Sequence, residues 1–580
     1  MMEVLKYDVV VLGSGLAGMR AALEAARASK GRLRIAVISK LHAMRSHSVA
    51  AEGGISGVLY PKKNKDNERL HAFDTIKGSD YLADQDAVQL LVKNAPNEIK
   101  LFDHLGVPWN RLDDARIGQR PFGGMSVPRT AFAADKTGFF MMSALYDTLL
   151  EFSNVDFFHE HLATAMIMNK NDFKGIFTMD MATRDTVFFS SGNGIIATGG
   201  FARIYQFTTT SYSSTGDGIA LAYNAGLPLK DMEFVQFHPT ALIPSGILIT
   251  EAARGEGAYL LNAKGERFMK KYAASKMELA PRDIVSRAIY SEFAAGMGVT
   301  DSRFGDIEHV QLDLRHIGDR DIDEKLPMIK EISIKQLGID PSKEPLPVRP
   351  AAHFTMGGIH VGIDGNVLSV SGKKVSGLWA AGECGCVSVH GANRLGSNSL
   401  SQCVIWGKIT GEKAAKRALA RSKTTLPLVG RLYDEEGKIN ILLTKNGSES
   451  PYEIRRELWA AMERDVNVYR NNAGLRRALK TVHELKERFK DVSVEDKSKV
   501  YNTNLRDTVE IGNMIGLAET VITGAINRKE SRGAHAMHEY PSRDDKNFLK
   551  HSIMYKKKEG ITLEYVKVKI TNWKPEARHY

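Results

Sequence analysis

The first forty residues alternate between apolar runs and one helical pattern. YDVVVLGSG (7–15) is an apolar run that ends in glycines, and LAGMRAALEA (16–25) has apolar residues at helical spacing. RIAVIS (34–39) is a second apolar run. Short apolar runs bounded by turn residues are typical of buried strands, and a helix between two of them is typical of an α/β unit. The pattern therefore predicts that the chain opens as a strand, a tight glycine turn, a helix and a strand.

Later patterns fall into two groups. GNGIIATGG (192–200) and GLWAAGE (377–383) are apolar runs that predict strands returning to the first domain. Three stretches place apolar residues at helical spacing beside charges, which predicts a helical bundle: residues 452–470, 474–489 and 509–529. Residues 426–450 are interpreted as a linker. VKVKITNWKPEARHY (566–580) alternates apolar and basic residues, which favours a strand or an extended arm.

These patterns suggest four regions. A discontinuous nucleotide-binding domain covers 1–237 and 351–425, and an inserted capping domain covers 238–350. A helical domain covers 426–545, and a C-terminal tail covers 546–580. The expected fold class is α/β: a Rossmann-like domain with an inserted α+β cap, a C-terminal helical bundle and an extended tail.

Composition narrows the class of protein. The chain has 580 residues, of which 43% are hydrophobic and 25% charged, and this is an ordinary globular balance. We find no run of eighteen apolar residues, and we expect no secretory leader. The three cysteines form no CxxC pair, so we expect no zinc or iron–sulfur site in this chain, and no metal. The net charge of +11 is spread along the sequence without a basic, aromatic-rich block, and this makes a nucleic-acid partner a weak option.

The glycine turn carries the first chemical signal. Gly13-Ser14-Gly15-Leu16-Ala17-Gly18 is a G-x-G-x-x-G pattern between a predicted strand and a predicted helix. In that context the glycines let the backbone approach a pyrophosphate, and the helix N-terminus stabilises its charge. An acidic residue at the end of the next strand would hold a ribose, but Ser39 and Lys40 stand there, and this points away from a simple NAD site.

A second motif specifies the dinucleotide. RSHSVAAEGG (45–54) resembles the RSHTVAAEGG stretch of the succinate dehydrogenase and fumarate reductase flavoprotein subunits. In that family the histidine is joined covalently to FAD, so the resemblance implies FAD tethered through His47. Ser48 replaces the commoner threonine and keeps its hydroxyl. The resemblance runs nearly end to end and implies that further residues contact the cofactor: Ser46, Glu52, Gly53, Gly54, Ala197, Thr198, Gly199, Asp217, Glu383, Ser399 and Leu400. An N-cap role is the alternative interpretation of Asp217.

Five short motifs occur in the family order and supply groups suited to a dicarboxylate. By resemblance Arg394 and His353 bind one carboxylate, while His238 and Thr250 bind the other. Arginine suits this task because its planar fork pairs bidentately with carboxylate. Arg282 matches the proton-transferring arginine of the family, and Glu251 and Arg254 match the relay that passes the proton onward. Sequence reasoning alone would not have chosen Arg282 over His238 or His353, which are the ordinary general bases.

Two segments depart from the family pattern. Ala252 and Ala253 stand where relatives often have a Gly-Cys pair, so we expect activity to resist thiol-blocking reagents. Met537 and His538 interrupt the Arg-Glu-Asp run that is common in relatives, so no site residue is assigned there.

The resemblance also implies partners. With no cluster ligands of its own, the chain is expected to pass electrons to an iron–sulfur subunit on one or more membrane anchor subunits. This would place it peripherally on the cytoplasmic face of the cell membrane, in respiration and the tricarboxylic acid cycle. A soluble L-aspartate oxidase-like enzyme is the nearest alternative, although His47 argues against it. A flavin-binding factor that modifies nucleic acid is a more distant one.

Overall fold

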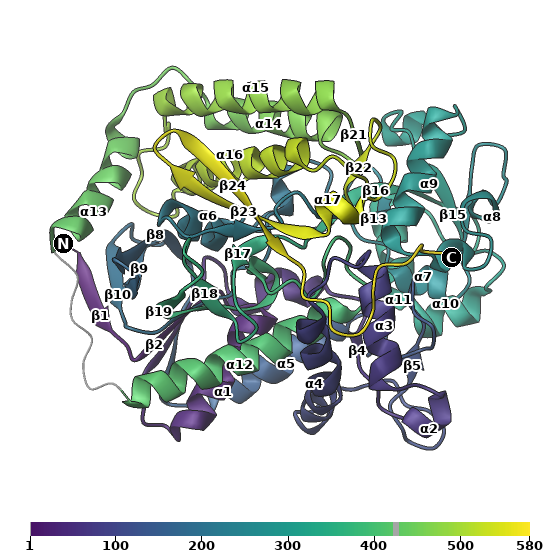
Figure 1. Cartoon of the computed structure of the whole chain (residues 1–580), viewed down its shortest axis with the longest axis horizontal. Helices are drawn as coiled ribbons and strands as arrows, with labels where there is room; N and C mark the ends of the chain where they lie inside the picture. Colours follow the sequence, from purple (N-terminus) through teal and green to yellow (C-terminus); the bar gives the residue numbers. More distant parts are fainter. Residues whose placement is uncertain (1, 421–428) are drawn as a thin grey trace.

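The computed structural model describes residues 2–420 and 429–580, and its largest sheet organises the first half of the chain (Figure 1). Ten strands form this sheet, in the order β1-β10-β9-β19-β11-β2-β3-β7, with β18 beside β19 and β8 beside β9. Its parallel centre consists of β7 (Val155–Phe158), β3 (Ile35–Ile38), β2 (Val9–Leu12), β11 (Gly194–Ile196) and β19 (Lys374–Ala380). The other strands are β1 (Glu3–Lys6), β8 (His161–Asn169), β9 (Asp172–Asp180), β10 (Thr186–Ser190) and β18 (Asn366–Leu368).

The apolar runs of the sequence become the buried centre of this sheet. All residues of β2 and β3 are buried, as parallel strands covered on both faces require. Two helices pack together along one face: α1 (Leu16–Ser29) and α12 (Asn398–Ala420). α3 (Glu68–Gly78), α4 (Gln85–His104) and α5 (Thr137–Leu150) lie nearby. The expected α/β fold class is confirmed.

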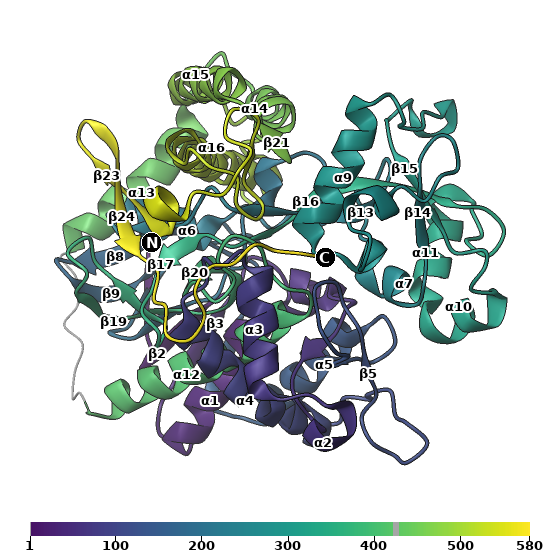
Figure 2. The same cartoon turned by 45° about the vertical axis from the view of Figure 1, so that its right-hand side comes forward.

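A second body projects from the first (Figure 2). Its four-stranded antiparallel sheet has the order β13 (Val235–Leu242), β16 (Leu346–Thr355), β15 (Val310–Asp313), β14 (Tyr259–Leu261). Its helices are α7 (Glu251–Gly255), α8 (Met269–Tyr272), α9 (Arg282–Ala294), α10 (Asp319–Lys325) and α11 (Pro327–Leu337). This cap has its own apolar core. Because β13 and β16 run through the expected boundaries at 237/238 and 350/351, both chain crossings into the cap are strands of one sheet.

The three helical patterns form α14 (Pro451–Asp465), α15 (Asn472–Arg488) and α16 (Thr503–Asn527). α16 is apolar and long enough to cross a membrane, but 67% of its most apolar stretch is buried inside the protein. It is therefore placed as a core helix.

The linker expected at 426–450 is wrong over most of its length. Residues 429–444 form α13 (Val429–Thr444), whose Leu432, Ile439 and Leu443 are buried against strands β8 to β10. These side chains recur at helical intervals between charged residues, and that spacing indicates a helix face rather than a linker. Residues 426–428, and residues 421–425 at the end of the expected nucleotide domain, lie outside the described residues.

The C-terminal region returns to the body of the molecule. β23 (Lys550–Lys557) and β24 (Gly560–Lys567) form a hairpin that joins β12 (Leu229–Lys230), β17 (Gly358–His360) and β20 (Gly385–Cys386) in a five-stranded sheet. Smaller elements complete the fold: β4 (Ile55–Ser56), β5 (Gln119–Arg120), β6 (Thr130–Ala131), β21 (Tyr469–Arg470), β22 (Ala536–Met537), α2 (Pro61–Asn64), α6 (Asp217–Asn224) and α17 (Asp545–Phe548).

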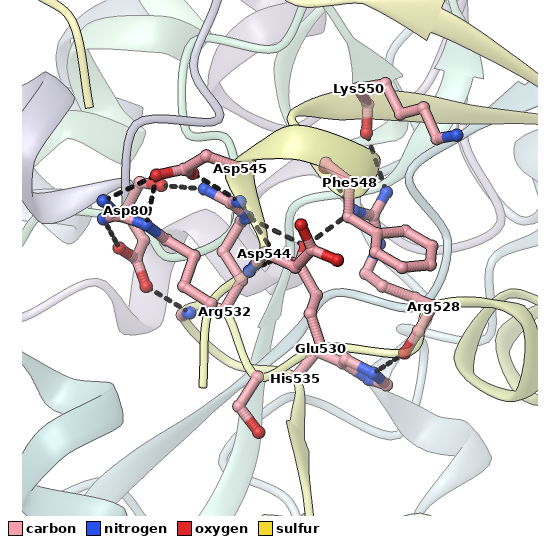
Figure 3. A network of polar contacts seen from close by, with 12 residues as sticks. Asp80, Arg528, Glu530, Arg532, His535, Asp544, Asp545, Phe548 and Lys550 are labelled. Atoms are coloured by element: carbon pink, nitrogen blue, oxygen red, sulfur yellow. Dashed lines mark hydrogen bonds and ion pairs between the residues drawn. The ribbon is translucent and has the colours of Figure 1, made fainter. Parts of the chain in front are cut away.

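A buried ionic network anchors this region, and Figure 3 shows it. Glu530 accepts hydrogen bonds from both Arg528 and Arg532 at 2.8–3.0 Å, and all three side chains are fully buried. Arg528 also pairs with Glu233 at 2.7 Å, and Arg532 with Asp545 at 2.8 Å. Every nitrogen of both guanidinium groups has an acceptor. We call these five residues the C-terminal network.

The last residues cross from the nucleotide domain to the cap (Figure 2). The Arg578 guanidinium lies 3.0 Å from a carboxylate oxygen of Asp80 and 2.6 Å from one of Asp283, at the start of α9. The tail thereby holds the cap against the sheet domain close to Arg282.

Candidate active site

One large cavity lies where the central sheet, the cap and the N-terminus of α12 meet. It is lined by nearly all the residues that the sequence singled out. These are Gly13, Ser14, Gly15, Leu16, Ala17, Ser39, Lys40, Ser46, His47, Ser48, Glu52, Gly53, Gly54, Ala197, Thr198, Gly199, Asp217, His238, Thr250, Glu251, Arg282, His353, Glu383, Arg394, Ser399 and Leu400. Two expected residues, Gly18 and Arg254, do not line it. The structure thus gathers side chains from positions nearly 390 residues apart in sequence around one space.

The glycine turn between β2 and α1 packs too tightly for side chains. Gly13 has φ +111°, and a Cβ there would lie 2.2 Å from the carbonyl oxygen of Ala197. A Cβ on Gly18 would lie 1.9 Å from the carbonyl oxygen of Gly13. Gly18 therefore serves close helix–strand packing behind the turn, and this explains its absence from the cavity wall.

Lys40 and Asp217 form an ion pair at the edge of the cavity. The Lys40 ammonium lies 2.6 Å from an oxygen of Asp217 and 2.6 Å from one of Glu510. Gly216, not Asp217, is the N-cap of α6. The alternative N-cap interpretation of Asp217 is therefore wrong: its carboxylate binds Lys40, Thr215 and Asn513 instead.

The cavity has the chemistry of a dinucleotide site. The Ser14 and Thr198 hydroxyls are buried without a hydrogen-bond partner. Buried polar groups are normally paired, so unpaired ones on a cavity wall indicate a ligand. Burial raises the pKa of Glu383 to about 7, against two hydrogen bonds from Thr355 that lower it. The first residues of α12 face the cavity, and their free N–H groups favour electron-rich ligand atoms. These residues fit FAD.

His47 begins a single 3₁₀ turn, η2 (His47–Ala50), on the cavity wall. Its Nδ1 accepts a hydrogen bond from the main-chain N–H of Ser211 at 3.4 Å. Burial, and then the charge of Arg203, lower the pKa of His47 to about 4. The neutral ring therefore carries its proton on Nε2, the nitrogen left for the ligand. The Ser48 hydroxyl accepts from the N–H of Leu16 at 3.1 Å and joins this turn to α1.

Arg394 and His353 form one half of the expected clamp. An Arg394 nitrogen donates to Nε2 of His353 at 2.9 Å, and Nδ1 of His353 lies 2.7 Å from the Thr209 hydroxyl. Because guanidinium only donates, His353 must accept at Nε2 and is neutral. A second Arg394 nitrogen donates to Ser399, whereas its Nε is buried without a partner.

His238 and Thr250 form the other half. Nδ1 of His238 accepts from the Thr240 N–H at 3.3 Å, so a neutral ring carries its proton on Nε2, which is buried and unpaired. The Thr250 hydroxyl accepts from the Ala252 N–H as the N-cap of α7, and its own hydrogen stays free to donate. The rings of His238 and His353 are 4.9 Å apart, so both halves face one small space.

Arg282, the first residue of α9, leads from this space into the protein. Its Nε donates to Glu251 at 2.8 Å, and its Nη1 donates to Gln236 at 3.1 Å. Glu251 lies 3.8 Å from Arg254, which donates to the Glu278 carbonyl at 2.5 Å. Arg254 thus lies one step behind the wall. The three expected relay residues form one continuous chain of contacts.

Where the two halves of the clamp face each other, the three arginines Arg254, Arg282 and Arg394 lie near the single carboxylate of Glu251. Burial, and then Arg282, hold the pKa of His238, His353 and Arg394 well below their ordinary values. Burial would raise the pKa of Glu251, but Arg282 and Arg254 hold it below its usual value. A doubly negative ligand would offset this excess charge.

Glu52 lies on the same wall with the opposite tendency. Burial and the nearby Asp135 raise the pKa of Glu52 well above its usual value, and one of its oxygens is buried without a partner. A neutral carboxyl there can donate a hydrogen bond into the cavity.

Sequence reasoning missed several residues of the site. Gln236 bonds both Arg282 and the Arg394 carbonyl, and Gly123 donates to Glu251 at 2.6 Å. Strand alternation could have found Gln236, two residues before His238, but nothing in the sequence marked Gly123. Cys403 also lines the cavity, where burial raises its pKa to about 12.

The departures elsewhere in the chain lie away from the cavity. Met537 is buried in the main apolar core, and His538 stacks on Tyr469. Neither lines the cavity wall.

Comparison with known proteins agrees with this geometry. Residues 8–400 match a family model described as an FAD binding domain, and residues 455–580 match one described as the fumarate reductase flavoprotein C-terminus. The chain is 41% identical to a fumarate reductase flavoprotein subunit of Escherichia coli, over 100% of this chain and 96% of that protein. It is 40% identical to a succinate dehydrogenase flavoprotein subunit of Rickettsia bellii, over 99% and 97%.

Solved structures give the same result. An E. coli quinol fumarate reductase chain superimposes with a TM-score of 0.95 at 40% identity, covering 99% of both chains. A Mycobacterium smegmatis Sdh1 chain superimposes with a TM-score of 0.85 at 32% identity, covering 99% of this chain and 96% of that one.

Proposed function

The chain belongs to the family of fumarate reductase and succinate dehydrogenase flavoprotein subunits, and from this premise we propose that it interconverts succinate and fumarate. As a member it is an FAD-dependent oxidoreductase. The observation that carries the proposal is the pair of facing donor sets in the cavity. Arg394 with His353 stands on one side, and His238 with Thr250 on the other.

Each donor set would bind one carboxylate. On one side Arg394 supplies the N–H donors, and His353 holds that guanidinium by accepting one of its N–H groups. On the other side the Nε2 proton of His238 and the Thr250 hydroxyl are the donors. Holding a substrate at both ends fixes its central carbons, and such orientation is worth up to about 7–11 kcal/mol of barrier. The unpaired polar atoms of the cavity would then find partners.

Arg282 would transfer the proton. In succinate oxidation Arg282 would first give a proton to Glu251, which already accepts its Nε–H, and the neutral guanidine would then take the proton from the carbon next to the one that loses hydride. Glu251 and Arg254 would carry the released proton toward the interior of the cap. In fumarate reduction the same groups deliver it. The bound FAD supplies the hydride chemistry, which none of these side chains can perform.

FAD would be bound by the glycine turn, Glu383 and the N-terminus of α12, and joined covalently to Nε2 of His47. The Ser211 hydrogen bond supports this choice of nitrogen, because it occupies Nδ1. Glu52 would adjust the electron affinity of the flavin, since a neutral carboxyl lowers it less than a carboxylate does.

The chain would act with partners. The C-terminal family match and the similarity to quinol fumarate reductase and Sdh1 chains support an iron–sulfur subunit that receives electrons, on membrane anchor subunits at the cytoplasmic face of the cell membrane. The domain limits given above remain our proposal, with the cap as the closing element over the substrate.

The test is an assay of the purified FAD-loaded protein in both directions. We expect succinate-dependent reduction of a dye and fumarate-dependent oxidation of a reduced viologen. His47→Ser should retain bound FAD but lose most succinate oxidation. Turnover of L-aspartate with no turnover of succinate or fumarate would overturn the proposal.

A further inference from the structure

Arg203 has a place that the proposed chemistry does not use. It lies in the 3₁₀ turn η3 (Ala202–Ile204), is only 8% exposed, and has an unpaired Nε. Its guanidinium makes its hydrogen bonds to main-chain carbonyls: Nη1 to Gln206 at 3.1 Å and Nη2 to Thr210 at 3.0 Å. A buried arginine that holds main chain, rather than a carboxylate, is costly to keep and calls for a function.

The carbonyl of Thr210 and the N–H of Ser211 belong to one peptide group. Arg203 therefore binds the oxygen end of that group, while its N–H end donates to Nδ1 of His47 at 3.4 Å. A positive charge at the oxygen withdraws electron density from the amide and strengthens its N–H as a donor. The three groups form a line from guanidinium through peptide to imidazole.

We propose that Arg203 is the positioning residue for His47: through the Thr210–Ser211 peptide it fixes the imidazole with Nδ1 as acceptor and Nε2 toward the cavity, and keeps the ring uncharged. The purpose of this positioning rests on the proposed function, in which FAD is joined covalently to His47. The contacts themselves involve protein groups alone.

The surroundings of Arg203 hold it in this geometry. The Tyr212 ring lies 3.9 Å from the guanidinium carbon and covers it from solvent, and the Trp459 indole donates to the Arg203 carbonyl at 2.7 Å. The turn is therefore fixed from both sides. The arginine reaches His47 through the Thr210–Ser211 peptide of this loop.

The charge of the ring matters for both tethering and turnover. A hydrogen bond to unprotonated Nδ1 stabilises the neutral form, and the nearby guanidinium destabilises the cation, so both lower the pKa of His47. Among titratable groups, His353 also faces the ring. A neutral imidazole keeps its charge constant beside the flavin across the working pH range.

The test measures the protonation of His47 directly. The full chain, with and without FAD, is labelled with ¹⁵N in its histidine rings, and His47 is assigned from the signals lost in His47→Gln. In the wild type we expect the Nδ1 signal to stay unprotonated from pH 8 to 5. In Arg203→Gln the pH at which His47 is half protonated, its midpoint, should rise by at least about one pH unit, a tenfold gain in proton affinity.

Three control variants test whether the contacts from Arg203 through the Thr210–Ser211 peptide set the midpoint of His47. Arg455→Gln removes the other arginine of the same crevice, which contacts the rings of Tyr452 and Trp459, and should leave the midpoint unchanged. Ser211→Ala keeps the donating N–H and should also leave it unchanged. Arg203→Lys keeps the charge without the two-carbonyl geometry and should give a midpoint between those of the wild type and Arg203→Gln.

The outcomes separate this inference from the proposed function. An unchanged midpoint in Arg203→Gln overturns the proposed positioning of His47 by Arg203. A wild-type midpoint in Arg203→Lys shows that charge alone acts and also overturns it. Acid precipitation of the same samples reports the tether independently. If flavin leaves the wild-type protein while the midpoint is raised in Arg203→Gln, the covalent attachment of FAD is contradicted and the positioning of His47 by Arg203 is supported.

Discussion

Two buried clusters of arginines in this molecule differ in whether their polar atoms are paired. In the C-terminal network, Arg528 and Arg532 share Glu530, and every guanidinium nitrogen has an acceptor. In the cavity, Arg394 and His238 each keep a buried nitrogen without a partner. Satisfied buried networks make a structure rigid, whereas unsatisfied polar groups persist where a ligand completes them.

The same contrast appears in the buried histidines. His551 lies between two carboxylates, 3.2 Å from Asp84 and 2.7 Å from Asp231, while His238 faces arginines. Burial would lower the pKa of His551, but Asp231 outweighs it and the pKa is raised. The comparison indicates that the network serves stability and the cavity serves binding, and five substitutions test it.

The largest effect is expected at Arg282. Arg282→Met removes the proton-transferring group, and such groups contribute about 10²–10⁴-fold to rate. We expect kcat for fumarate reduction to fall by this factor while the protein stays folded. Arg287→Met, on the same helix but paired with Asp283, is the matched control and should retain most activity. Equal losses in the two variants would assign the effect to the helix rather than to the side chain.

The next effect concerns the network. Glu530→Ala leaves Arg528 and Arg532 buried without their shared partner, and breaking a buried pair costs about 3–5 kcal/mol. Denaturant unfolding should show this loss. Glu559→Ala, in the exposed hairpin turn, should change the free energy of unfolding by less than about 0.5 kcal/mol. A stable Glu530→Ala protein would contradict the structural role.

A dicarboxylate should stabilise the folded protein by binding in the cavity, without involving the C-terminal network. Malonate at a hundred times its dissociation constant should raise the stability of the FAD-loaded protein by about 2.7 kcal/mol, visible as a higher Tm. Arg394→Gln should abolish this shift, since the key donor is lost. Arg320→Gln, an exposed cap arginine, should preserve it. A shift of similar size in both variants would place malonate elsewhere.

The smallest effects are those on pH dependence, and the two histidines should give opposite signs. His551 has a raised pKa, so its stabilisation is present below pH 6.5 and is lost as pH rises through its folded value. His238 has a lowered pKa, so stability is lost as pH falls from 6.5 toward its folded value. We would plot the free energy of unfolding against pH from 5 to 9. Compared with the wild type, the plot should be flatter above pH 6.5 in His551→Gln and flatter below pH 6.5 in His238→Gln. Flattening on the same side would contradict the assigned shifts.

The sequence pattern predicted the fold correctly where the residues of a single strand or turn carry the signal. The runs of β2 and β3 are buried on both faces, and the glycine turn between β2 and α1 is a consequence of close packing at Gly13. The linker prediction failed because α13 presents few apolar residues to strands β8 to β10, chiefly Leu432, Ile439, Leu442 and Leu443. Burial against a distant sheet is a tertiary fact that its sequence shows only weakly.

The site shows the same limit. Residues in motifs, such as His47 and Arg394, were found by resemblance, and the cavity gathers them. Gly123 and Thr209 were missed because each acts through a main-chain N–H or a neutral hydroxyl, which sequence does not distinguish from loop chemistry. The Thr210–Ser211 peptide is a contact of the same kind and becomes visible only in three dimensions.

A crystal structure of the FAD-loaded protein with malonate tests the central claim most directly. The account predicts one carboxylate against Arg394 and His353 and the other against His238 and Thr250, with the unpaired cavity nitrogens satisfied. Malonate bound outside the cavity, or inside it with Arg394 and His238 still unpaired, would contradict it.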